Sequence, residues 1–154
     1  MLMEQVAEDS HYVDTLIYPI CFNFRHAIEL SLKHLNHVLP RIWSEQAPTK
    51  WTHKLLDNWT SVRGYLERDR DFDPDGTLVP GVEHVLKEYL RIDGNGEVFR
   101  FPSAKSGALH LQEMSVINVE RLYDSLEATQ VTFDWWDFTA ERLWDAQCEM
   151  FASG

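Results

Sequence analysis

The chain has 154 residues, of which 44% are hydrophobic, 25% charged and 12% aromatic. This composition is typical of one soluble globular domain with a sizeable core, and it excludes a disordered chain. The formal net charge of −11 disfavours general binding of nucleic acids, because a surplus of acidic side chains repels phosphate.

The first residues, MLMEQVAEDSHYVD, lack the basic and apolar regions of a signal peptide. No apolar run approaches the ~18 residues that a membrane-spanning helix needs. Cys21 and Cys148 both lie among apolar residues, which predicts buried thiols in a reducing compartment. We therefore expect one domain over 1–154 that is cytoplasmic, without a cofactor, a metal site or contact with a membrane.

Apolar residues recur at helical spacing from Ile20 onwards and predict a first long helix. Its apolar arc consists of Ile20, Phe24, Ala27, Ile28, Leu32, Leu35, Val38 and Leu39. Pro40 is expected to end this helix, and Pro19 predicts a separate or kinked helical segment around 13–17. After the connector SEQAPTK, a second helix is expected to carry Trp51, Leu55, Trp59, Val62 and Leu66.

Pro80 can open a third helix, with Val82, Val85, Leu86, Tyr89 and Leu90 on its apolar side. EVFRFP and ALHLQ flank the loop SAKSG and predict a small β-hairpin near 97–112. Helical spacing returns from Ser115, with a break expected at the β-branched run 129–132 before a last Trp-rich helix. The fold class is therefore mainly α: an antiparallel bundle of four to six helices with one hairpin.

The stretch Asp71–Gly76 matches the first half of a calcium-binding loop, with acidic residues at positions one, three and five and glycine at six. The twelfth position is Val82, so the bidentate glutamate of such a loop is missing. We interpret the stretch as a solvated acidic turn without metal.

The arc of the first helix opposite its apolar side carries Arg25, Glu29 and Lys33 at i,i+4 spacing. Such pairs are ordinary on a solvated helix surface. Phe22 and Leu30 share this arc, however, and a face that mixes apolar and charged residues is also typical of one covered by a partner. The pattern leaves both interpretations open.

The string YPICFNFRHAIELSLKHL resembles the first long helix of HEPN domains (higher eukaryotes and prokaryotes nucleotide-binding). The stretch Thr52–Leu56, followed by Trp59, resembles their second helix. The stretch Phe99–Pro102, continuing through Lys105 and Gly107, resembles their short hairpin. The resemblance implies a helical bundle, often a homodimer, and many members are ribonucleases in toxin–antitoxin or phage-defence systems.

Those ribonucleases use an arginine that holds the scissile phosphate and a histidine, four to six residues later, that acts on the ribose 2′-hydroxyl. No arginine of this chain has a histidine at that spacing, so a site would have to be composite. The resemblance makes Arg25, His26, Glu29 and Lys33 the catalytic candidates. The candidates for binding substrate or phosphate are His53, Arg100 and Lys105.

An alternative is a non-catalytic protein of the same fold that binds a toxin, an enzyme subunit or a phage factor. Its surface would combine the acidic charge with the segment FDWWDFTAERLW. Trp135 and Trp136 point about 100° apart on a helix, so we expect an interface role here besides Phe22 and Leu30. A third hypothesis is a receptor for a small nucleotide, with Arg25, Lys33 and Lys105 on the phosphate.

Overall fold

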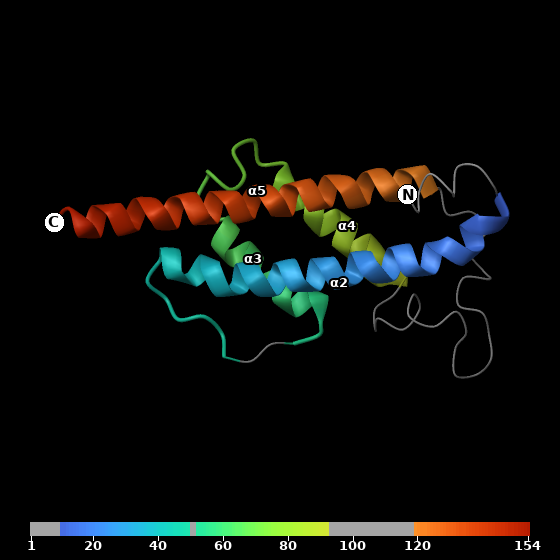
Figure 1. Cartoon of the computed structure of the whole chain (residues 1–154), viewed down its shortest axis with the longest axis horizontal. Helices are drawn as coiled ribbons and strands as arrows, with labels where there is room; N and C mark the ends of the chain where they lie inside the picture. Colours follow the sequence, from blue (N-terminus) through green and yellow to red (C-terminus); the bar gives the residue numbers. More distant parts are fainter. Residues whose placement is uncertain (1–9, 50–51, 93–118) are drawn as a thin grey trace.

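A computed structural model describes residues 10–49, 52–92 and 119–154 (Figure 1). Within these ranges the chain forms four helices and no strand. They are α2 (Ser10–Ile42), α3 (Leu55–Leu66), α4 (Leu78–Ile92) and α5 (Val119–Ala152). The prediction of a mainly α fold is confirmed. The predicted hairpin near 97–112 lies outside the described residues, as does Trp51.

The two long helices α2 and α5 lie side by side and run in the same direction, with α3 and α4 packed across one side of them (Figure 1). Their shared direction follows from two contacts. His34 of α2 lies 2.7 Å from Asp137 of α5, and further along both helices Gln147 donates to the carbonyl of Ile42. The predicted antiparallel arrangement is therefore wrong for this pair.

Helix α3 also follows the direction of α2, because Asn36 donates to the carbonyl of Asn58 and Trp43 contacts Tyr65 further along both helices. The chain between α2 and α3 makes this possible. Extended, residues 43–54 can span up to ~40 Å, whereas α3 with its 12 residues is about 18 Å long. Among the described helices, only α4 runs against α2, and Tyr89 near its end donates to the carbonyl of Cys21 in the first half of α2 (Figure 1).

Helix α2 continues through both of its prolines, so Pro40 does not end it and the segment around 13–17 is not a separate helix. A proline removes one backbone hydrogen bond, and the fully buried Leu39 keeps the last turns packed on the core. The helix ends where Ser44 adopts a left-handed φ of 56°. The backbone N–H of Ser44 then donates to the carbonyl of Arg41 at 3.0 Å, and the N–H of Glu45 donates to the carbonyl of Pro40 at 2.9 Å, as in a Schellman motif.

The acidic stretch before α4 is a helix cap. One carboxylate oxygen of Asp73 accepts hydrogen bonds from the N–H groups of Thr77 and Leu78, each at 2.9 Å, and the other accepts from Val79 at 3.0 Å. Three donors at the start of α4 are thereby satisfied. In the part of the chain that the structure describes, no group of three or more His, Cys, Asp or Glu residues is placed to hold a metal ion.

The predicted break at 129–132 is absent, and α5 is one helix of 34 residues. Both threonines of this stretch donate their hydroxyl hydrogen to a backbone carbonyl of the same helix, Thr129 to that of Ser125 (2.7 Å) and Thr132 to that of Ala128 (2.9 Å). Because the hydroxyls are satisfied there, their methyl groups can pack on the core without interrupting the helix.

The core joins all four helices around two stacked tryptophans, Trp59 of α3 and Trp136 of α5, whose ring centroids are 5.9 Å apart. Cys21 is buried as predicted, but Cys148 is exposed near the projecting end of α5, and neither is in a disulfide. No helix among the described residues has the length and apolar character needed to cross a bilayer.

Candidate functional site

Four of the predicted site residues come together where α2 passes the segment before α3. Glu29 accepts a hydrogen bond from Lys33 Nζ at 2.7 Å, and the same oxygen lies 2.9 Å from His53 Nδ1. Arg25 Nη2 donates to the backbone carbonyl of His53 at 3.3 Å. The cluster is thus composite: three residues lie one turn apart on α2, and the fourth comes from another part of the chain.

Two asparagines hold the segment that carries His53. Asn36 of α2, which is buried, donates to the carbonyl of Asn58 at 3.1 Å. Asn58 in turn donates to the carbonyl of Thr52 at 2.9 Å. Sequence reasoning did not select either asparagine. Asn58 offered a signal, since it lies among the apolar residues of the second predicted helix and a buried polar group must find a hydrogen-bond partner. Asn36 was expected on the charged arc of the first helix, and its burial corrects that expectation.

The two central residues differ strongly in exposure. The side chain of Glu29 is 14% exposed and that of His53 is 89% exposed. Burial by itself raises the pKa of Glu29, but the hydrogen bonds from Lys33 and His53 outweigh burial, so its pKa lies below the ordinary value. Glu29 is therefore ionised at neutral pH.

An ionised carboxylate only accepts hydrogen bonds, so Nδ1 of His53 is the donor in this pair. Nε2 of His53 then remains for a ligand on the solvent side. A partly buried carboxylate that orients an exposed imidazole, with a guanidinium beside it, is suited to general acid–base chemistry at an anionic group.

The other predicted site residues are not part of this cluster. His26 is exposed on the outer side of α2, where its ring stacks on Phe22 with a centroid distance of 6.5 Å. Arg100 and Lys105 lie outside the described residues.

The predicted partner surface is corrected at one residue. Phe22, Leu30 and Trp135 are 38%, 53% and 40% exposed, as an interface role requires. Trp136 is fully buried, and its indole N–H donates to the carbonyl of Phe72 at 2.9 Å. It is a core residue because α5 turns this position toward α3.

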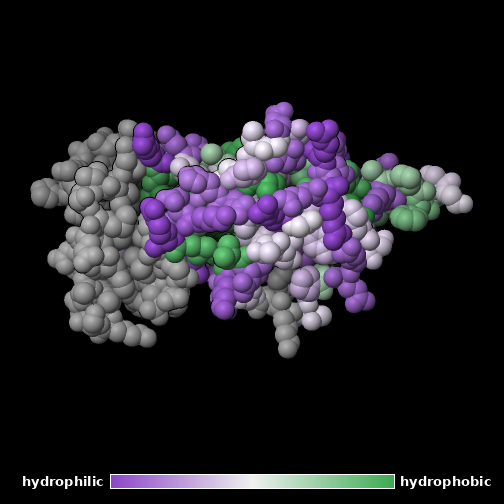
Figure 2. Space-filling view, turned by 180° about the vertical axis from the view of Figure 1, so that it is seen from behind, coloured by the Kyte–Doolittle hydropathy of each residue, from purple (hydrophilic) through white to green (hydrophobic). Residues whose placement is uncertain are grey.

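Helix α5 carries further exposed hydrophobic side chains. Phe138 and Trp144 lie within the segment FDWWDFTAERLW of the predicted partner surface, whereas the sequence did not single out Tyr123, Val131, Met150 and Phe151. The last two stand at the end of α5, which projects beyond the other helices as a hydrophobic tip (Figures 1 and 2). Isolated exposed hydrophobic residues are common, but several along one helix are typical of a binding surface.

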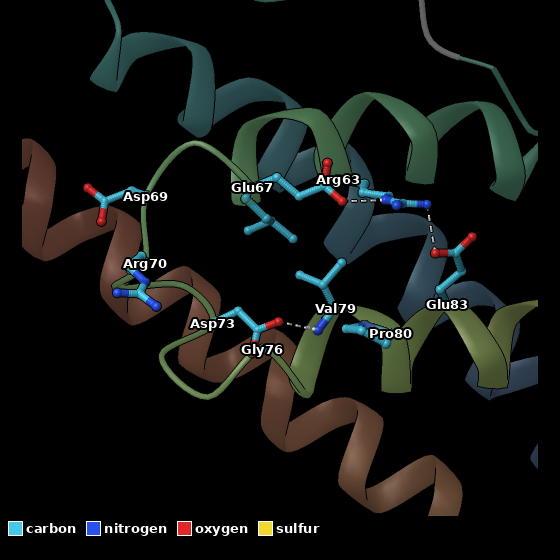
Figure 3. Close-up of a pocket in the computed structure, with 10 residues that line it drawn as sticks. Arg63, Glu67, Asp69, Arg70, Asp73, Gly76, Val79, Pro80 and Glu83 are labelled. Atoms are coloured by element: carbon cyan, nitrogen blue, oxygen red, sulfur yellow. Dashed lines mark hydrogen bonds and ion pairs between the residues drawn. The ribbon is translucent and has the colours of Figure 1, made fainter.

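A pocket of about 290 Å³ lies between the end of α3 and the start of α4 (Figure 3). Arg63 stands between Glu67, 2.7 Å away, and Glu83, 2.8 Å away. The hydrogen bond to Glu67 and the charges of both carboxylates raise the pKa of Arg63. The hydrogen bond from Lys87 is the largest effect lowering the pKa of Glu83. These ion pairs join the two helices, and none of the predicted site residues lines the pocket, so it is not our candidate site.

Comparison of the chain with protein-family models, curated proteins and solved structures finds no match. The HEPN-like assignment therefore stays a prediction from the sequence strings, and the function has to be argued from the residues themselves.

Proposed function

We propose that this chain cleaves RNA at a composite site formed by Arg25, Glu29, Lys33 and His53. The observation that carries the proposal is the 2.9 Å contact between Glu29 and Nδ1 of the exposed His53. It orients an imidazole with Nε2 facing solvent, while Arg25 supplies a guanidinium on the same side of α2. The toxin–antitoxin or phage-defence setting implied by the HEPN resemblance stays a prediction, as do homodimer formation and the cytoplasmic location.

In the proposed reaction, Arg25 and Lys33 offset the charge of the scissile phosphate. Nε2 of His53 takes the proton of the ribose 2′-hydroxyl, and the 2′-oxygen attacks phosphorus. The bond from phosphorus to the 5′-oxygen breaks, and the leaving oxygen takes a proton from water. The products are a 2′,3′-cyclic phosphate and a 5′-hydroxyl end. The local cationic groups have to act against the net charge of −11. Because salt screens the attraction of Arg25 and Lys33 to the phosphate, we expect cleavage to weaken as salt rises.

The test is cleavage of labelled total RNA and of small structured RNAs by the purified full chain in the presence of a chelator. His53→Ala is expected to lower the rate about 100-fold, because general-base catalysis is lost. Glu29→Gln should lower it as well, since a neutral amide orients the imidazole less strongly. His84→Ala is the matched control, because His84 is an exposed histidine on α4. Absence of cleavage by the wild-type chain, or equal rates for His53→Ala and His84→Ala, would refute the proposal.

A second function is favoured by a different observation, the exposed hydrophobic side chains along α5. We propose that α5 binds a partner protein, independently of any RNA cleavage at the cluster on α2. Its acidic residues outnumber its two arginines, which favours a basic partner. The peptide-binding experiment below tests this function.

A further inference from the structure

A groove of about 410 Å³ lies between α4 and α5. Its floor consists of apolar side chains of α4, with Val82 buried and Leu78 and Val85 partly buried. Its walls are made of small residues, including Gly81 of α4 and Ser125 and Ala128 of α5. Small side chains let another helix approach closely, since the distance between two helix axes depends on the residues at their contact.

The groove continues into a ridge on α5. Asp124 and Ala128 line the groove, and Val131, Trp135 and Phe138 follow at steps of three and four residues. Residues at such steps lie along one side of a helix. Val131 is 62% exposed and Phe138 59% exposed, and the rings of Trp135 and Phe138 lie 6.2 Å apart. The apolar surface is therefore longer than the groove alone and has the shape of a strip.

Acidic side chains accompany the strip on α5. Asp124 lines the groove, and Glu127 and Asp134 are exposed next to Ala128 and Trp135. On α4, the exposed Glu88 already pairs with Arg91 at 3.0 Å. Arg121, one turn before Ser125, is the basic side chain nearest on α5. A ligand with an apolar stripe flanked by lysine or arginine matches both the floor and the rim.

We propose that the groove between α4 and α5 binds a basic amphipathic helix of a partner protein. This inference rests on the second proposed function and adds to it the place of binding and the chemistry of the partner.

Two glycines provide a matched pair of variants. Gly81 lines the groove, whereas Gly64 lies exposed in α3 and lines none of the pockets described here. A Cβ atom added to either would meet no atom within 4 Å, so both positions accept a side chain without a clash inside the chain. Leucine has a higher helix propensity than glycine, so either substitution should also stabilise the helix that carries it. Loss of binding in Gly81→Leu alone would therefore report on the groove and not on folding.

The probe is a labelled synthetic peptide of about 15 residues with leucines at helical spacing and lysines on both flanks. Its binding to the full chain is followed by fluorescence anisotropy. We expect Gly81→Leu to weaken binding by about 10-fold or more and Gly64→Leu by less than about 2-fold. A peptide with glutamates in place of the lysines should bind about 10-fold more weakly than the basic one.

A double variant of the hydrophobic tip, Met150→Ser with Phe151→Ser, distinguishes binding in the groove from partner binding elsewhere on α5. Binding that survives Gly81→Leu but is lost in the tip variant would overturn the groove and leave partner binding by α5 standing. No binding of the basic peptide to the wild-type chain would overturn both. Equal binding of the basic and acidic peptides would overturn the charge argument and hence the stated class of partner.

Discussion

The same substitution at the two adjacent tryptophans of α5 should change the stability of the fold by very different amounts. Trp136 is fully buried, stacks on Trp59 and lies edge-on to Phe133 at 5.3 Å. Trp135 is 40% exposed and contacts Phe138. We predict that Trp136→Phe strongly destabilises the fold, whereas Trp135→Phe, one residue away, has little effect.

The magnitude follows from two losses at Trp136. Phenylalanine cannot donate to the carbonyl of Phe72, which currently accepts the indole N–H at 2.9 Å. A buried acceptor left without its donor costs about 1–2 kcal/mol. The smaller ring also leaves unfilled volume in the core, which costs roughly another 1–2 kcal/mol. The total for Trp136→Phe is therefore about 3 kcal/mol, against about 0.5 kcal/mol or less for the exposed Trp135.

Urea unfolding followed by far-ultraviolet circular dichroism measures both variants without relying on tryptophan fluorescence. With a slope of about 2 kcal/mol per molar urea, Trp136→Phe should lower the midpoint by about 1.5 M and Trp135→Phe by less than about 0.3 M. Equal shifts in the two variants would refute the assignment of Trp136 to the core. A loss below about 1 kcal/mol in Trp136→Phe would refute the energetic argument.

Two further predictions concern the ends of helices, and the same unfolding assay measures them. Ser44→Gly should stabilise the chain by about 0.5–1 kcal/mol, because glycine adopts the φ of 56° that ends α2 without steric cost; a destabilised variant would contradict this reading of the helix end. Asp73→Ala should cost about 1–2 kcal/mol, since three N–H groups at the start of α4 lose their acceptor, while the exposed Asp75→Ala serves as control and should cost less than about 0.5 kcal/mol. Similar losses in the two variants would show that the cap does not act as described.

The periodicity of apolar residues located most of the described helices, because the buried side of a helix recurs every 3.6 residues whatever it packs against. The expected helix boundaries at Pro40 and at 129–132 were wrong for one shared reason. Proline and threonine lower helix stability locally, and the packing of neighbours such as Leu39 outweighs that cost. Local helix propensity alone does not show whether packing outweighs this cost.

One part of the candidate cluster could likewise be predicted from the sequence, and another part could not. The sequence by itself determined that Arg25, Glu29 and Lys33 share one side of α2, since residues four apart lie one above the other on a helix. Only the tertiary structure decided that His53 joins them and that His26 does not. The reason is that α3 runs parallel to α2 and is tied to it by Asn36, and this places the residues before α3 against Glu29.

The direction of each helix and the choice between Trp135 and Trp136 were likewise decided by tertiary packing. A helical pattern states which residues share a side, but it does not state how many neighbours surround the helix or which way they run. Here α2 and α5 run together, and α3 packs on α2 and brings Trp59 against Trp136, so the side of α5 that holds Trp136 is enclosed. Sequence periodicity thus determined the helices of this protein, and contacts between distant residues determined which of their polar and aromatic side chains remain accessible to a substrate or a partner.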